Sequence, residues 1–156
     1  MKKPVVYLDT SVIGGCFDQQ FALWSNGLIE DIRSHHYAFA TSEIVALEIS
    51  RAPAEVQLKY GELLEFCEPL LCTPNEEVVD LVDAYLGHGI LSEKFRNDMM
   101  HIALAAVFAV DIVASWNFKH IVRYEKIVRF NAVNLEYGYR QLAIHSPREV
   151  SSYGSN

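Results

Sequence analysis

The sequence has few cysteines and no long hydrophobic run, and both absences narrow the class of protein. The three cysteines, Cys16, Cys67 and Cys72, are odd in number, and their spacing matches no zinc-binding pattern, so we expect buried or half-buried free thiols. The longest apolar run, over residues 102–110, is about half as long as a transmembrane helix requires. The amino-terminal residues lead directly into an apolar run and lack the features of a signal peptide. We therefore expect a cytoplasmic protein without a membrane segment.

Several motifs that identify common enzyme classes are also absent. The sequence contains neither of the glycine-rich phosphate-binding patterns, GxGxxG and GxxxxGK[ST]. It also lacks the GxSxG nucleophile elbow and the HExxH zinc helix. The segment Asp9-Thr10-Ser11 has no second aspartate two residues after Asp9, as aspartyl-phosphate phosphatases have. These absences argue against the enzyme classes that depend on those motifs.

The net charge is −7, and it is distributed unevenly. Residues 55–83 contain eight acidic residues and a single lysine, so this segment alone accounts for the whole net charge. Residues 119–129 form a basic stripe with one acidic residue, and its bases are Lys119, Arg123, Lys126 and Arg129. Such a stripe is typical of a solvated helix face or of a contact with nucleic acid, and spacing alone favours the solvated face.

Apolar runs alternate with helical patterns along the chain, which is typical of α/β proteins. We predict strands at residues 5–8, 37–40, 69–72, 111–115 and 142–144, and helices at 23–34, 41–50, 55–66, 97–110 and 121–139. A further helix is predicted from a capping box in which Thr73 is the N-cap, Pro74 the first helical residue and Glu76 its partner. The expected fold is a three-layer α/β/α sandwich with a mainly parallel sheet of four to five strands. It occupies residues 1–146, and residues 147–156 form a C-terminal tail.

Acidic and amide side chains occur where the predicted strands end or where helices begin. Asp9 follows the first strand, Glu48 lies in an apolar helix, Asp98 opens the helix over 97–110, and Asn117 follows the fourth strand. Because parallel strands end at one edge of a sheet, one edge can gather all four side chains. Crowded carboxylates raise one another's pKa values, and a hard cation such as Mg²⁺ or Mn²⁺ removes that penalty. The pattern therefore favours a metal site suited to phosphodiester hydrolysis.

Each of these residues also has a simpler interpretation. An aspartate after a strand is often a turn or cap residue, an isolated Glu48 can be an exposed helix residue, and Asp98 can serve only the helix dipole. We expect Ser11 either to cap the next helix or to bond Asp9. We expect His101 to be a buried histidine in the core or behind the metal ligands, and not to bind the metal itself.

With these residues in view, the chain resembles the PIN-domain family, which includes VapC-type toxins of toxin–antitoxin pairs. The resemblance covers residues 5–118 and rests on four segments: Tyr7–Ser11, Ala46–Ile49, Asp98–Ala105 and Asp111–Phe118. It implies a PIN-like fold and a Mg²⁺- or Mn²⁺-dependent endoribonuclease whose metal ligands are Asp9, Glu48 and Asp98. It also implies that Thr10 or Ser11 supports Asp9, that the chain forms a homodimer, and that an antitoxin binds near the site. Asn117 stands where the family often has a fourth aspartate.

Three hypotheses follow. The first is a ribonuclease in which Asp9, Glu48 and Asp98 hold the ion, Asn117 orients water or substrate, and the basic stripe contacts RNA. The second is a PIN-like binding module that has lost catalysis and acts through a protein or RNA partner, as Asn117 and the acidic net charge suggest. The third is a metal-dependent phosphatase that acts on small phosphate esters.

Overall fold

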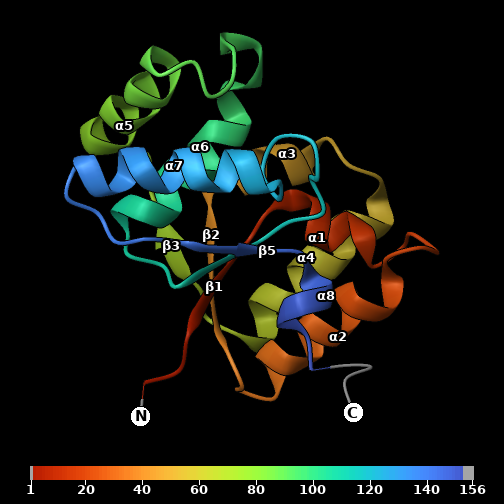
Figure 1. The fold of residues 1–156 in the computed structure, drawn as a ribbon. Coiled ribbons are helices and arrows are strands. Elements are labelled where there is room, and N and C mark those ends of the chain that lie inside the picture. The colour runs from red at the N-terminus through yellow and green to blue at the C-terminus, as the bar shows by residue number, and fades with distance from the viewer. Residues whose placement is uncertain (1, 153–156) are drawn as a thin grey trace.

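The protein is described here by a computed structural model, which covers residues 2–152 and has a five-stranded parallel sheet at its centre (Figure 1). The strand order is β3-β2-β1-β4-β5, and every neighbouring pair is parallel. The strands are β1 (Val5–Leu8), β2 (Ala38–Ser42), β3 (Leu70–Cys72), β4 (Ile112–Ala114) and β5 (Ala143–His145). Together with the helices on both faces, this confirms the predicted α/β sandwich.

Two groups of helices cover the sheet (Figure 1). One group consists of α5 (Glu76–Gly87), α6 (Arg96–Val107) and α7 (Tyr124–Glu136), preceded at α6 by a 3₁₀ turn, η1 (Glu93–Phe95). The other consists of α1 (Thr10–Gly15), α2 (Ala22–Arg33), α4 (Ala54–Phe66) and α8 (Pro147–Val150). Helix α3 (Glu43–Ser50) contacts both groups through α4 and α6. Within residues 2–152, none of the helices has the length and hydrophobicity needed to cross a membrane.

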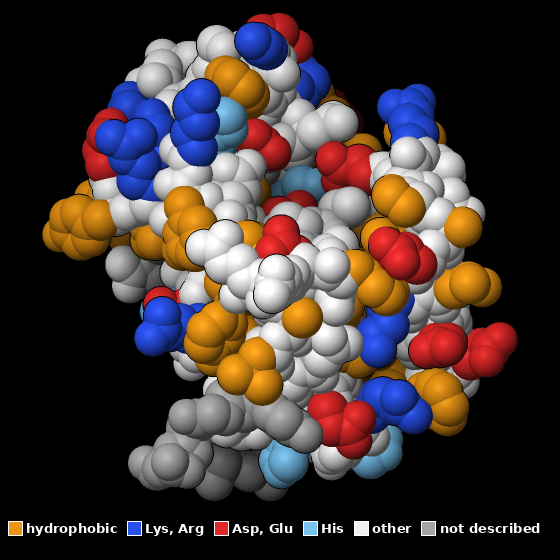
Figure 2. All heavy atoms as spheres, turned by 90° about the vertical axis from the view of Figure 1, so that its right-hand side faces the viewer, with side chains coloured by type: hydrophobic (Ala, Val, Ile, Leu, Met, Phe, Trp, Pro, Cys, Tyr) orange, Lys and Arg blue, Asp and Glu red, His pale blue; other side chains and the backbone are white. Residues whose placement is uncertain are grey.

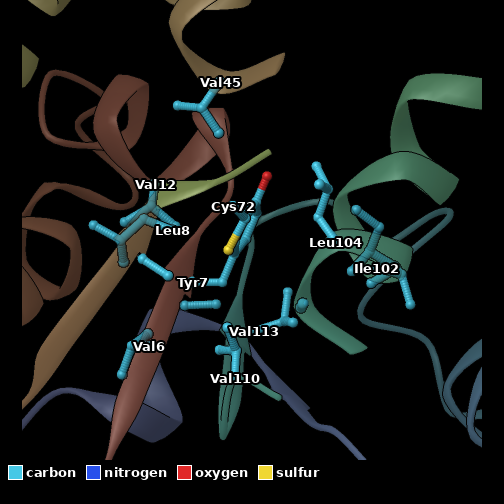
Figure 3. Packing of buried hydrophobic residues seen from close by; sticks show 14 of the residues in the cluster. Val6, Tyr7, Leu8, Val12, Val45, Cys72, Ile102, Leu104, Val110 and Val113 are labelled. Carbon is cyan, nitrogen blue, oxygen red and sulfur yellow. The ribbon is translucent and has the colours of Figure 1, made fainter. Parts of the chain in front are cut away.

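The core is built around β1, the middle strand. Successive side chains of a strand point to opposite faces, so Val6 and Leu8 lie on one side of the sheet and Tyr7 on the other (Figure 3). All three are almost completely buried. Tyr7 faces the layer of α6, whose side chains from Met99 to Ala106 are all buried. A central parallel strand covered on both faces explains the uninterrupted apolar run in the sequence.

The order of the strands identifies the edge of the sheet where a ligand site is expected. From β1 the chain proceeds to β2 and β3 on one side, and it then returns to place β4 and β5 on the other. The carboxyl ends of β1 and β4 therefore form the topological switch point of the sheet. Asp9 follows β1, and its N–H donates a hydrogen bond to the carbonyl oxygen of Ala114 at the end of β4, at 3.1 Å. Residues 115–117 continue from β4 beside it.

Some predicted element boundaries are wrong. The predicted capping box at Thr73, Pro74 and Glu76 is not formed, because Asn75 is the N-cap of α5 and its Oδ1 accepts a hydrogen bond from the N–H of Val78 at 2.9 Å. Strand β2 continues to Ser42, two residues beyond the prediction, and Ser42 is also the N-cap of α3. Helix α6 ends at Val107, because Ala109 adopts a positive φ of 55°.

Helix α1 was not predicted, because Gly14-Gly15 is typical of a loop. Gly15 is required there by packing: a Cβ on this residue would lie 2.6 Å from both Ser25 Oγ and Trp116 Nε1. The residues predicted as a tail include α8, which packs against α2, while residues 153–156 lie outside the described part. The boundary at residue 146 stays a prediction. Cys16 and Cys72 are buried and Cys67 is half-buried, which confirms the expected free thiols.

Candidate metal centre

Asp9 is held by hydroxyl groups at the switch point of the sheet. Its Oδ2 accepts hydrogen bonds from Ser11 Oγ at 2.9 Å and from Ser115 Oγ at 2.6 Å. The residue is only 6% exposed. Of the two roles expected for Ser11, the bond to Asp9 is the one observed. Because both hydroxyls bind Oδ2, the other carboxylate oxygen, Oδ1, remains directed to different neighbours.

Glu48 reaches the same point from α3. Its Oε1 accepts hydrogen bonds from Thr10 Oγ1 at 2.8 Å and from His101 Nε2 at 2.7 Å. Burial raises the pKa of Glu48, but the bonds and charge from His101 and the bond from Thr10 lower it by more, so the carboxylate is ionised at neutral pH. Ligand atoms of Asp9, Glu48 and His101 all lie within 4.8 Å of one another. The fold thus brings together the two acids that are 39 residues apart in the sequence.

His101 is the end of a buried hydrogen-bond chain that determines which ring nitrogen faces the carboxylates. Ser42 Oγ accepts from the N–H of Val45 at 3.2 Å and lies 2.7 Å from the hydroxyl of Tyr7. That hydroxyl lies 2.7 Å from His101 Nδ1. The Nε2 atom faces Glu48 Oε1 at 2.7 Å and Asp9 Oδ1 at 3.4 Å.

The Nε2 atom of His101 acts as a donor in this arrangement. An ionised carboxylate only accepts hydrogen bonds, so Nε2 carries a hydrogen whether the ring is neutral or protonated. Burial lowers the pKa of His101, but the charges of Asp9 and Glu48 and the bond to Glu48 raise it to above its ordinary value. A nitrogen that donates its hydrogen to Glu48 has no lone pair for a cation in that state. In this arrangement His101 supports the carboxylate of Glu48, and its exclusion from the metal ligands stays a prediction.

Asp98 approaches the centre from the first turn of α6 but lies outside the Asp9–Glu48–His101 group. Its Oδ2 accepts a hydrogen bond from His120 Nδ1 at 3.0 Å. Burial raises the pKa of Asp98, the bond from His120 lowers it, and the charge of Asp9 raises it again, with a net increase. The effect of Asp9 means that the two carboxylates interact electrostatically across the site.

Two side chains that sequence analysis missed complete the surroundings of the acids. Ser115 is the first polar residue after β4 and donates to Asp9, and His120 holds Asp98 while its ring lies 3.9 Å from that of Phe95. Asn117 connects them: its N–H donates to Ser115 Oγ at 2.9 Å, and its Oδ1 accepts from the N–H of His120 at 2.9 Å. The signal was their position in the segment 115–120, which follows β4 at the same edge of the sheet as Asp9.

The basic stripe lies beside this centre. Lys119, Arg123 and Lys126 line a groove of about 630 Å³ together with His120, between the start of α7 and the segment from Gly89 to Phe95. Lys126 Nζ donates to the carbonyl oxygen of Ile90 at 2.8 Å, and Arg129 Nη2 donates to that of His88 at 2.6 Å. Lys119 and Arg123 are exposed. Figure 2 shows acidic side chains around a hollow with a histidine in it, and a group of Lys and Arg side chains to one side.

Replacing Tyr7 with Phe is expected to lower the free energy of unfolding by about 1–3 kcal/mol, because buried Ser42 and His101 each lose a hydrogen-bond partner. Urea denaturation measures the change. Tyr124→Phe is the matched control, since Tyr124 is 83% exposed, and its stability should equal that of the wild type. An unchanged midpoint for Tyr7→Phe would contradict the hydrogen-bond chain described above.

The chemistry of the acidic side chains suits a hard divalent cation. Asp9, Glu48 and Asp98 offer carboxylate oxygens, which Mg²⁺ and Mn²⁺ prefer. Among the basic side chains of residues 2–152, only His101 lies within hydrogen-bond or ion-pair distance of Asp9 and Glu48. Their negative charges therefore have one nearby basic partner. A bound cation would stabilise carboxylates that lie close together with so little positive charge nearby, because it offsets their mutual repulsion.

The fold is similar to that of a protein of known structure. A chain from the crystal structure of VapBC2 from Rickettsia felis bound to a DNA fragment from their promoter superposes with a TM-score of 0.58. The alignment covers 91% of this chain and 98% of that chain, at 14% sequence identity. At this identity the similarity shows the fold alone, which is PIN-like. No protein-family model matches the sequence, and a search of curated proteins finds no match.

Proposed function

We propose that the chain is a metal-dependent endoribonuclease and the toxin of a type II toxin–antitoxin pair. The observation that carries the proposal is the meeting of Asp9 and Glu48 within 4.8 Å at the switch point of a PIN-like sheet. Asp98, whose pKa responds to Asp9, would complete the set of residues that hold Mg²⁺ or Mn²⁺. A site of this kind does not require the glycine-rich phosphate-binding patterns, the nucleophile elbow or the zinc helix that the sequence lacks.

The residues of the chain have separate tasks in this proposal. When bound by Asp9, Glu48 and Asp98, a divalent cation would supply positive charge that lowers the pKa of water and stabilises charge on a phosphoryl oxygen. His101 and Thr10 fix the carboxylate of Glu48, and Ser11 and Ser115 fix that of Asp9. His120 fixes Asp98, and Asn117 shapes the turn that presents His120 and orients water or substrate. Lys119, Arg123, Lys126 and Arg129 attract the RNA backbone, with Lys119 and Arg123 the most available of the four.

The proposed partners follow from the sequence resemblance and from the name of the similar structure. VapBC2 was crystallised with promoter DNA. By analogy, we propose that this chain is silenced by an antitoxin bound near the carboxylates and that it forms a homodimer. Size measurement of the purified protein, alone and with the product of a neighbouring gene, tests both expectations.

A second function is favoured by one observation at the site. Asn117 lies three residues after the end of β4, and its Oδ1 already accepts a hydrogen bond from the N–H of His120. The centre thus has one negative charge fewer than a site with an aspartate there. A PIN-like module that binds a partner without catalysis fits this difference. Mn²⁺ affinity separates the two functions, because a catalytically dead site should not bind Mn²⁺ tightly in an Asp9-dependent way.

Replacing Asp98 with Asn is expected to reduce Mn²⁺-dependent cleavage of an unstructured RNA by about a hundredfold, because one metal-binding carboxylate loses its charge. The assay compares cleavage rates with Mn²⁺ and with EDTA. Asp80→Asn makes the same substitution on an exposed position of α5 and should leave the rate unchanged. Wild-type activity in a folded Asp98→Asn variant would remove Asp98 from the site, and cleavage in EDTA would contradict the metal dependence.

A further inference from the structure

Aromatic side chains form a cluster directly beside the candidate metal centre. The rings of Phe21 and Trp116 are stacked, with centroids 4.0 Å apart. The ring of Phe118 lies 6.1 Å from Trp116 in an edge-to-face arrangement and 6.5 Å from Phe21. Trp116 and Phe118 flank Asn117, so the cluster and the polar residues after β4 belong to one short segment.

The cluster is rigidly attached to the residues that hold Asp9. The N–H of Trp116 donates to Ser11 Oγ at 2.9 Å, and that hydroxyl donates to Asp9. The indole Nε1 of Trp116 donates to the buried Ser25 Oγ at 2.8 Å. Gly15 leaves room for the side chains of Trp116 and Ser25, because a Cβ at this position would lie only 2.6 Å from Trp116 Nε1 and from Ser25 Oγ. The backbone two residues before Phe118 is therefore held against the serine that bonds Asp9.

Phe118 leaves much of its ring open to solvent. It is 50% exposed although it packs against two other aromatic rings. The next residues, Lys119 and His120, line the basic groove. An exposed aromatic ring thus belongs to the short segment that joins Trp116, which is bonded to Ser11, to the basic residues of the groove, on a chain whose net charge is −7.

We propose that Phe118 stacks against an unpaired base of single-stranded RNA while the flanking phosphates lie along Lys119 and Arg123. This inference rests on the proposed function and specifies its substrate class. Stacking on an aromatic ring requires a free base face, which single strands offer and duplexes do not. Positive charge beside the ring matches the backbone that accompanies the base, whereas an apolar protein segment would gain nothing from Lys119 and Arg123.

The test measures binding of a fluorescein-labelled single-stranded RNA by anisotropy, in EDTA and at low salt, so that no cleavage takes place. Phe118→Ala should weaken binding by roughly fivefold to a hundredfold, and Phe118→Trp should restore it. Phe66→Ala is the matched control, because Phe66 is exposed like Phe118, at 60%, but lies at the end of α4. It lines a different pocket, together with Lys3 before β1. The same RNA annealed to its complement should bind more weakly than the single strand.

Each outcome bears on the proposal separately from nuclease activity. Loss of RNA binding in Phe118→Ala, with Phe66→Ala unchanged, supports the stacking role even if no variant cleaves RNA in Mn²⁺; that combination would refute only the proposed nuclease. Undiminished RNA binding by Phe118→Ala, or equal affinity for duplex and single strand, overturns the stacking role. A wild-type protein that does not bind single-stranded RNA in EDTA overturns it as well.

Discussion

Replacing Asp9 with Asn is expected to reduce metal-dependent RNA cleavage by more than about a hundredfold. Residues that only support a metal ligand cost about 10–100-fold when mutated, and Asp9 is a proposed ligand itself. Its carboxylate is buried, receives two hydroxyl bonds, and lies within 4.8 Å of Glu48. Asn preserves the size of the side chain and one oxygen acceptor, but it removes the charge that attracts a cation. Cleavage rates at saturating Mn²⁺ measure the effect.

The control for this variant is Asp18→Asn, which makes the same substitution on an exposed loop residue close to α1. It should cleave RNA at the wild-type rate. Because Asp9 is buried, the folding of its variant is checked by circular dichroism. Glu48→Gln provides a second variant, since the Glu48 side chain is 32% exposed and tolerates substitution more easily. If both variants are folded and retain wild-type activity, the acids are not the catalytic centre.

The sequence was sufficient to predict that Asp9 and Glu48 meet, whereas Asp98, which was predicted with them, lies outside the group that they form with His101. Asp9 follows an apolar run that only a central parallel strand explains, and Glu48 lies in the helix after the neighbouring strand. Because parallel strands end at one edge of the sheet, a residue after β1 and a residue in the helix after β2 are both expected at that edge. The predicted order of elements then determined the layers. Registers did not need to be known, because the site depends on which edge the side chains share.

The remaining contacts depend on backbone geometry that no local pattern encodes. His120 reaches Asp98 only because Asn117 closes a turn whose amide oxygen accepts from the N–H of His120. His101 lies three residues after Asp98 on α6, yet it bonds Glu48 and approaches Asp9. Such bonds are decided by the packing of α6 against β1 and α3. Thr73 was predicted to cap α5, but Asn75, an equally good N-cap residue two positions later, caps the helix instead.

The same packing explains why buried polar residues accumulate behind the acids. Tyr7 is on the face of β1 that points toward α6, so its hydroxyl lies 2.7 Å from His101 Nδ1 and 2.7 Å from Ser42 Oγ at the end of β2. Polar groups in a buried position must be satisfied, and here they are satisfied by one another. The result is a set of carboxylates whose orientation is fixed before any ligand arrives, as a catalytic or binding site requires.

Addition of Mn²⁺ is expected to raise the melting temperature by about 5–10 °C at a concentration one hundred times the dissociation constant. A ligand that binds only the folded state contributes about 2.7 kcal/mol under that condition, and a chain of this length gains about 2–4 °C per kcal/mol. The physical source is relief of the repulsion between carboxylates, of which the effect of Asp9 on Asp98 is one, at a site where His101 is the basic side chain paired with Asp9 and Glu48. EDTA should reverse the shift, and differential scanning fluorimetry measures it without any requirement for catalysis.

The dependence of this shift on Asp9 distinguishes the nuclease from the binding module. In Asp9→Asn the Mn²⁺-induced increase should disappear, because the remaining carboxylates no longer crowd one another, while Asp18→Asn should show the full increase. An equal shift in all three proteins would mean that Mn²⁺ binds elsewhere, for example among the acids of α4 and α5. Absence of any shift in the wild type would instead favour a PIN-like module that uses this edge of the sheet without a metal ion.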